Sequence, residues 1–114
     1  MAGNPVASYA APTVVTDGAT QTFDCLNAAQ FVWTLGANRT VSTFANPPGG
    51  ARITLTVTQD ATGSRLLTWP SNVRWPAATA PTLTVTAAKS DIFNFHYNAT
   101  TNVWDASTVG LNYT

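Results

Sequence analysis

The segment RITLTVTQ, residues 52–59, alternates apolar and polar side chains without a break. In an extended chain this period of two places Ile53, Leu55 and Val57 on one face of a strand and threonines on the other. Similar segments recur about every 8 to 12 residues, separated by turn-forming Gly, Pro, Asn and Asp, as in sandwiches and barrels. No stretch carries apolar side chains at helical spacing. The sequence therefore predicts an all-β fold.

Short turns between the predicted strands favour antiparallel hairpins. The turn DATGS, residues 60–64, is expected to pair the strand ARITLTVTQ, residues 51–59, with residues 65–69 as a hairpin, with Gly63 at a positive φ. A further strand is expected over residues 82–87, TLTVTA. The favoured architecture is an antiparallel two-sheet sandwich of the jelly-roll kind, and a small closed barrel is the alternative.

The length of 114 residues suits one domain, which we expect to span residues 13–114. Residues 1–12 are predicted to form an extended N-terminal arm, although a frayed terminus fits them as well. Val6 and Tyr9 favour an arm that packs on a neighbouring molecule, because both are unusual in a purely solvated tail. The start of the chain lacks the basic and apolar regions of a signal peptide, and no apolar run approaches the ~18 residues of a membrane span.

Charged residues make up only 9% of the chain, against about 25% in a typical globular protein. Five basic and five acidic side chains give a net charge of zero. This balance lacks the basic excess that nucleic acids or anionic membranes require, so neither is an expected partner. A net charge near zero favours association. The outward threonines therefore suggest a surface that meets other protein, although β-propensity alone would also explain them.

Residues that could carry chemistry are few. Cys25 is the single cysteine and is expected to be a buried small hydrophobe. Ser90, Asp91 and His96 could form a catalytic set, but nothing in their spacing selects it, and His96 is expected to be a hydrogen-bonded structural residue. Neither metal-ligand spacing nor a phosphate-binding loop is present. We predict no catalytic, cofactor or metal site, and no enzyme.

Four tryptophans supply the strongest candidates for contact surfaces. Alternation places Trp33 and Trp104 in the core. Trp69 and Trp75 each precede a proline and are expected to be partly exposed, as interface anchors or, alternatively, as rings that stack on sugars. The predicted interface residues are therefore Val6, Tyr9, Trp69 and Trp75.

Several motifs together resemble a β-rich module of tailed-bacteriophage virion proteins, found at tail-fibre ends and in small head-associated proteins. The resemblance covers roughly residues 13–113 and implies a virion structural protein, often trimeric, without catalysis. The motifs are NRTV (38–41), QDATGSR (59–65), TWPSNVRWP (68–76), APTLT (80–84) and DIFNFHYN with a following Trp (91–104).

The module fills the given sequence, whereas in tail fibres it follows a long attachment segment. We therefore predict a capsid decoration protein, a cement or head-spike protein made in the host cytoplasm. It would self-associate as a trimer and bind the major capsid protein, with residues 1–12 lying on the shell. The alternative is a tail-fibre or tail-tip module that recognises host surface glycan. Both place the protein in the virion, with the capsid surface favoured.

Overall fold

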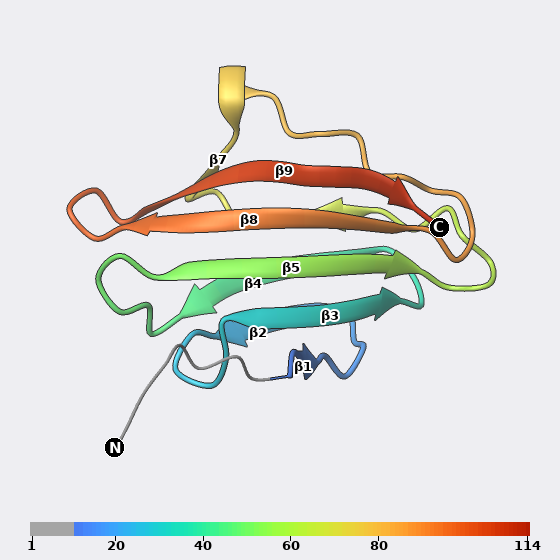
Figure 1. The fold of residues 1–114 in the computed structure, drawn as a ribbon, viewed down its shortest axis with the longest axis horizontal. Helices are drawn as coiled ribbons and strands as arrows, with labels where there is room; N and C mark the ends of the chain where they lie inside the picture. The colour runs from blue at the N-terminus through green and yellow to red at the C-terminus, as the bar shows by residue number, and fades with distance from the viewer. Residues whose placement is uncertain (1–10) are drawn as a thin grey trace.

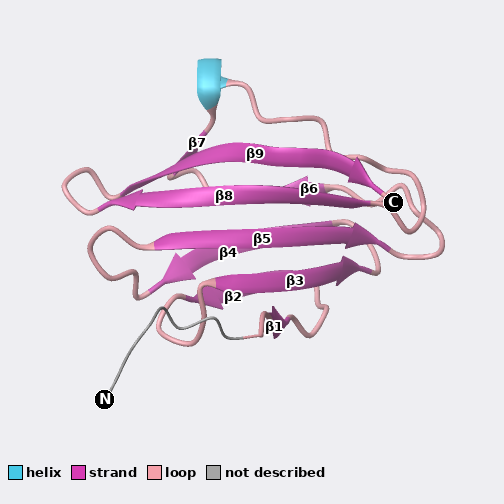
Figure 2. Cartoon of the chain, in the orientation of Figure 1, coloured by secondary structure: helices cyan, strands magenta, loops and turns pink. Residues whose placement is uncertain are grey.

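The computed structural model describes residues 11–114, which form two facing sheets (Figure 1). The larger sheet has the strand order β1 (Thr13–Val14), β3 (Gln30–Leu35), β5 (Arg52–Gln59), β8 (Ser90–Asn98), β9 (Val103–Tyr113), β7 (Val73–Arg74). The smaller sheet has the order β2 (Thr20–Asp24), β4 (Arg39–Ala45), β6 (Leu67–Thr68). One short 3-10 helix, η1 (Pro76–Ala78), projects beyond the larger sheet (Figure 2). No helix in this part of the chain is long and apolar enough to cross a membrane.

The first six strands wind as a coil, because each consecutive strand lies in the opposite sheet from the last. Strands β1, β3 and β5 consequently run parallel in the larger sheet, and β2, β4 and β6 run parallel in the smaller one. The remaining strands all join the larger sheet. Strand β8 adds antiparallel to β5, β9 returns antiparallel to β8, and β7 lies parallel to the start of β9.

The prediction of an all-β fold with two sheets is confirmed, but the predicted antiparallel pairing is wrong for the first half of the chain. Across residues 11–114, five strand pairs are parallel and two are antiparallel. Residues 60–64 do not close a hairpin, since they carry the chain from β5 in one sheet to β6 in the other. The alternation of apolar and polar residues shows which side chains face inward. It is the same whether the neighbouring strand is parallel or antiparallel, so it does not determine the pairing.

Residues 82–87 were expected to form a strand and do not, because their backbone groups bond to side chains and to a turn. The buried Asp91 carboxylate accepts the Thr84 N–H at 2.7 Å. The buried Gln59 amide donates to the Thr84 carbonyl at 2.9 Å. The Ser64 N–H donates to the Val85 carbonyl at 2.7 Å. The backbone groups of Thr84 and the Val85 carbonyl thus have partners without a neighbouring strand.

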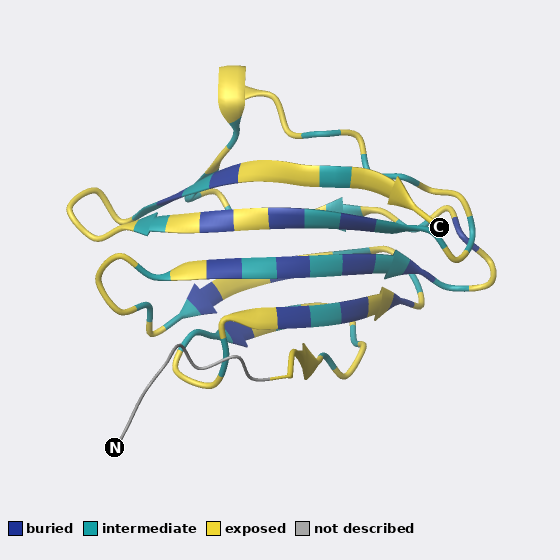
Figure 3. Ribbon diagram, viewed as in Figure 1, coloured by how far each residue is buried: buried dark blue, intermediate teal, exposed yellow. Residues whose placement is uncertain are grey.

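Inward side chains from both sheets form one aromatic core, with buried positions alternating along each strand (Figure 3). Phe44 of β4 joins the two sheets, because its ring centroid lies 4.9 Å from Phe95 and 5.0 Å from Trp104 of the larger sheet. It also stacks at 5.6 Å on Phe23 of its own sheet. Trp33 and Trp104 are each 1% exposed, which confirms their predicted place in the core.

A charged cluster fixes the corner between β3 and β4. The Asp17 carboxylate accepts hydrogen bonds from Trp33 Nε1 at 2.9 Å and from the Gly36 N–H at 3.0 Å. It also receives two bonds from Arg39, Nε at 3.0 Å and Nη2 at 2.6 Å. These bonds from Arg39 are the main reason that the pKa of Asp17 lies below its usual value, with smaller contributions from Trp33 and Gly36. Asp17 thus connects the core indole to the surface arginine.

Lowered carboxylate pKa values make the fold sensitive to acid. The pKa of Asp17 is lowered mainly by Arg39, that of Asp60 by Arg65 and that of Asp105 by Arg74. A carboxylate whose folded pKa lies below its unfolded pKa stabilises the fold fully above the unfolded value, about 3.9, and loses that contribution as the pH falls through the folded pKa.

We therefore expect the free energy of unfolding to be nearly constant from about pH 7 to pH 5 and to fall below about pH 4. Urea denaturation at several pH values measures this. Asp17→Asn removes one ionisable partner and should lower the free energy of unfolding at neutral pH by about 1–3 kcal/mol. The free energy of unfolding of this variant should also decrease less below about pH 4 than that of the wild type. A stability that rises between pH 4 and pH 3 would contradict the role of these ion pairs.

Candidate functional site

Trp69 and Trp75 lie together where the smaller sheet ends at β6. Their ring centroids are 5.4 Å apart in an edge-on arrangement. Trp69 lies 5.5 Å from Phe93 and from Phe95, and Trp75 lies 5.7 Å and 5.9 Å from the same two rings. Both tryptophans are partly buried, as expected. They cover the inner face of β8, so their packing is structural, and a role for them at an interface stays a prediction.

The other predicted residues fall into three groups. Val6 and Tyr9, with most of the proposed arm of residues 1–12, lie outside the described residues. Ser90, Asp91 and His96 are not brought together as a catalytic set, because Asp91 is buried on the inner face of β8 and His96 is exposed on the other face. Within residues 11–114, no three His, Cys or Asp side chains are grouped as a metal site requires.

Cys25 is half-buried beside the core, and burial raises the pKa of its thiol to about 11, with nearby Asp24 adding to the effect. Because the thiolate is the reactive form, we expect Cys25 in the folded protein to react with iodoacetamide about 100-fold more slowly than in urea at the same pH. Mass spectrometry of timed samples measures the two rates. Equal rates would show that the folded environment does not protect the thiol.

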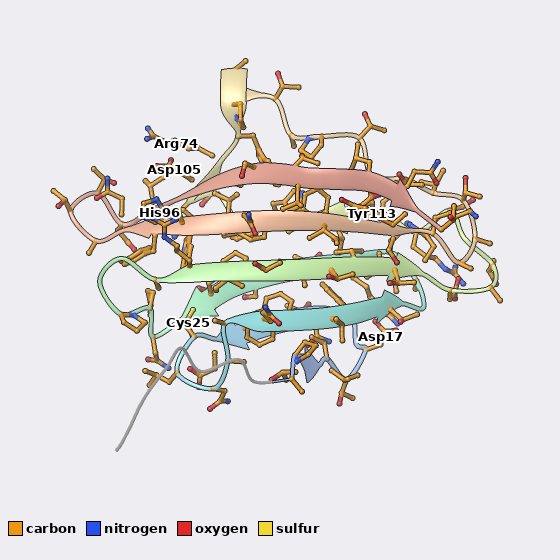
Figure 4. The ribbon with its side chains drawn as sticks, viewed as in Figure 1. Asp17, Cys25, Arg74, His96, Asp105 and Tyr113 are labelled. Atoms are coloured by element: carbon orange, nitrogen blue, oxygen red, sulfur yellow. The ribbon has the colours of Figure 1, made fainter. Side chains whose placement is uncertain are left out.

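The side of β5, β8 and β9 that faces away from the core, here called the outer face, carries aligned rows of polar side chains. Strand register places Arg52, His96 and Asp105 directly opposite one another across the three strands. Arg74 of β7 extends this row, opposite Asp105. Figure 4 shows Arg74, Asp105 and His96 close together at one end of the sheet. We call these four side chains the charged row.

A second row lies two residues farther along the strands, where Thr54, Asn94 and Ser107 stand opposite one another. The Thr54 hydroxyl donates to Asn94 Oδ1 at 2.9 Å, which fixes the orientation of that amide. The N–H donors on Asn94 Nδ2 have no partner among the described residues. The second row and the charged row, apart from Arg74, line a hollow of about 260 Å³ that is open to solvent.

Charge is unevenly distributed along the charged row. Arg74 forms an ion pair with Asp105, and bonding from Arg74 is the main reason that the pKa of Asp105 is lowered, with His96 adding a smaller effect. Among residues 11–114 no carboxylate lies within ion-pair distance of the Arg52 guanidinium. His96 was expected to be hydrogen-bonded, but its ring is exposed, and no partner for it occurs in the described structure. The row therefore presents one unpaired cation and an available imidazole.

The outer face ends in an aromatic ring at the far end of β9. Gly110 lies opposite Ile92 and has no side chain to cover the sheet there. The phenol of Tyr113 fills this place, since a Cβ added to Gly110 would lie 2.6 Å from Tyr113 Cζ and would overlap its hydroxyl. Tyr113 is 46% exposed. It is labelled in Figure 4 toward the end of the sheet opposite His96.

A family model described as "Putative phage tail fibre C-terminal domain" matches residues 15–105, most of the chain. The chain belongs to this family. Membership of the tail fibre C-terminal domain family makes the protein a bacteriophage structural protein and a virion component, as the resemblance to phage modules implied. Searches of curated proteins and of solved structures found no match. The matched residues contain the whole charged row and end before Ser107, Gly110 and Tyr113.

Proposed function

We propose that the protein is the receptor-binding module of a bacteriophage tail fibre and that it recognises host surface glycan without catalysis. The match to a tail fibre C-terminal domain carries this proposal, and it supports the tail over the capsid surface that the sequence analysis favoured. Capsid decoration remains compatible with a phage structural protein, but no feature of the described residues favours it.

The outer face supports glycan recognition by its chemistry. Sugars present hydroxyl groups that both donate and accept hydrogen bonds, and amide, guanidinium, imidazole and hydroxyl side chains complement them. The two rows supply all four types within a few residues of each other. Because these side chains are exposed and lie on paired strands, a glycan would replace water on a rigid surface.

A binding role without hydrolysis is consistent with the carboxylates. Glycoside hydrolysis by the usual route needs two carboxyl groups that flank one glycosidic bond. Of the described residues lining the outer hollow, Asp105 alone carries a carboxylate, and Arg74 pairs with it. The nearest acidic residue along β8, Asp91, is buried on the opposite face of the sheet.

Self-association as a trimer is part of the same proposal, because a fibre tip that displays three copies of a weak site gains strength by multivalency. Light scattering coupled to size-exclusion chromatography measures the mass directly. With a chain of 12.0 kDa, we expect a species of three times that mass. A monomer at all accessible concentrations would contradict the trimer. It would not bear on the location in the tail fibre, which is tested separately.

Immunogold electron microscopy of phage particles tests the location. Antibodies raised against the purified protein are expected to label the ends of the tail fibres. Labelling of the head instead would overturn the proposal and restore capsid decoration. An antibody against the major capsid protein provides the matched control on the same particles.

A further inference from the structure

We infer that the outer face of β5, β8 and β9 is the glycan site and that its ligand is an acidic oligosaccharide that carries carboxylate groups. This inference rests on the proposed function and adds both a place and a ligand class to it. Three features carry it: an unpaired cation in the charged row, oriented amide and hydroxyl donors in the second row, and the Tyr113 ring beyond them.

The charged row explains the preference for an acid. Arg52 lies beside His96 by strand register, and Arg52 has no carboxylate partner within residues 11–114. Asp105 cannot serve both arginines equally, because Arg74 holds it from the other side with Nε and, at 3.3 Å, with Nη2. A guanidinium pairs well with a planar carboxylate, which it can bind through two parallel hydrogen bonds. A ligand carboxylate placed over Arg52 and His96 would complete the row.

The second row supplies contacts for sugar hydroxyls. Thr54 holds the oxygen of the Asn94 amide, so the amide N–H donors are directed to other partners. Ser107 lies opposite Asn94 and adds a hydroxyl that can donate or accept. The two rows are two residues apart on each strand, or roughly 7 Å. This spacing allows the carboxylate and the hydroxyl groups of neighbouring sugar units to be bound at once.

Tyr113 gives the surface its apolar end. Its ring lies over Gly110, which is two residues beyond the second row when counted along β8 from Asn94 to Ile92. Aromatic rings with one exposed face suit the apolar face of a sugar ring, and the phenol hydroxyl provides a polar edge. The outer face is therefore long enough for a short oligosaccharide that lies along β8 and β9.

Isothermal titration calorimetry with surface polysaccharide from the phage's host strain tests the inference. The probe is used in its native form and after carbodiimide activation and borohydride reduction, which convert each carboxylate into a primary alcohol. We expect native polysaccharide to bind and the reduced form to bind about tenfold more weakly or not at all. Equal binding of the two forms would overturn the acidic ligand.

Variants of the outer face locate the site. Arg52→Gln and Asn94→Ala are each expected to weaken binding of native polysaccharide about tenfold. Gly110→Ala keeps every functional group but displaces the Tyr113 ring. Both Gly110→Ala and Tyr113→Ala should therefore weaken binding. Lys89→Gln removes the same charge as Arg52→Gln and is the matched control, expected to change binding less than about twofold. Thermal unfolding of each variant verifies that it folds.

The outcomes separate the inference from the proposed function. If the wild type binds native polysaccharide and all outer-face variants bind equally well, the site lies elsewhere and the proposed function stands. An equal loss of affinity in Lys89→Gln and Arg52→Gln would show that binding depends on general charge attraction and not on the charged row. That result would overturn the site. If the wild type binds no host polysaccharide in either form, glycan recognition itself fails.

Discussion

Replacing Phe44 by alanine is expected to lower the free energy of unfolding by about 3–5 kcal/mol, the usual cost of deleting a buried phenyl ring. Phe44 is 4% exposed, and its ring contacts aromatic side chains in both sheets. The neighbouring strands are fixed by their hydrogen bonds, so they cannot collapse fully into the space that the ring leaves. Since small domains have a total stability of about 5–15 kcal/mol, this loss is a large fraction of it.

Urea denaturation measures the change, and Leu66→Ala is the control because Leu66 is 53% exposed. Loss of an exposed side chain normally changes stability by less than about 0.5 kcal/mol. A change of that size in Phe44→Ala would mean that the two sheets are not joined through this ring. Phe44→Leu, which keeps most of the volume, is expected to retain much of the stability.

Replacing Gly63 by alanine is expected to cost about 2–4 kcal/mol, for two separate reasons. Gly63 has a φ of 74°, a left-handed conformation that costs residues with a Cβ about 1–2 kcal/mol. An added Cβ would also lie 2.7 Å from the Val85 carbonyl oxygen and 2.9 Å from the Ala87 nitrogen. Both are backbone atoms, so the turn and residues 82–87 would have to separate.

Gly50→Ala isolates the first reason, the cost of the left-handed conformation. Gly50 has the same φ of 74°, but a Cβ placed there would meet nothing within 4 Å. We expect Gly50→Ala to cost only the conformational part, about 1 kcal/mol. The difference between the two variants in urea denaturation therefore measures the contact between the turn and residues 82–87. Equal losses would show that this contact does not stabilise the fold.

Much of the secondary structure could be predicted because alternation is a local property. The strand expected over residues 51–59 forms over residues 52–59, and residues 90–98 alternate faces, with Phe93 and Phe95 inward and Asn94 and His96 outward. The left-handed Gly63 in its turn was also predicted correctly. In each case the pattern of a few neighbouring residues determines the outcome.

Strand pairing could not be predicted in the same way. A link such as residues 60–66 can close a hairpin or cross to the other sheet, and the alternating pattern on both sides is identical for the two. The failure at residues 82–87 has a different cause. The Gln59 and Asp91 side chains bond the carbonyl and the N–H of Thr84 in place of a neighbouring strand, and both come from other parts of the sequence.

The candidate site could not be predicted because it also depends on strand pairing. Arg52, His96 and Asp105 lie on three different strands and come together only through strand register. Their outward positions were visible from alternation, but their alignment was not. A position before a proline instead pointed to Trp69 and Trp75, whose rings the structure places against core phenylalanines. Exposed polar residues at outward strand positions were the signal that could have pointed to the outer face.

Binding of the fluorescently labelled protein to host cells is the most direct test of glycan recognition by the outer face. We predict saturable binding that is abolished when periodate cleaves the vicinal diols of the cell surface, that survives protease treatment of the cells, and that Arg52→Gln weakens about tenfold. Binding that resists periodate but is lost after protease treatment would contradict a glycan receptor. Undiminished binding by Arg52→Gln would exclude the outer face as the site.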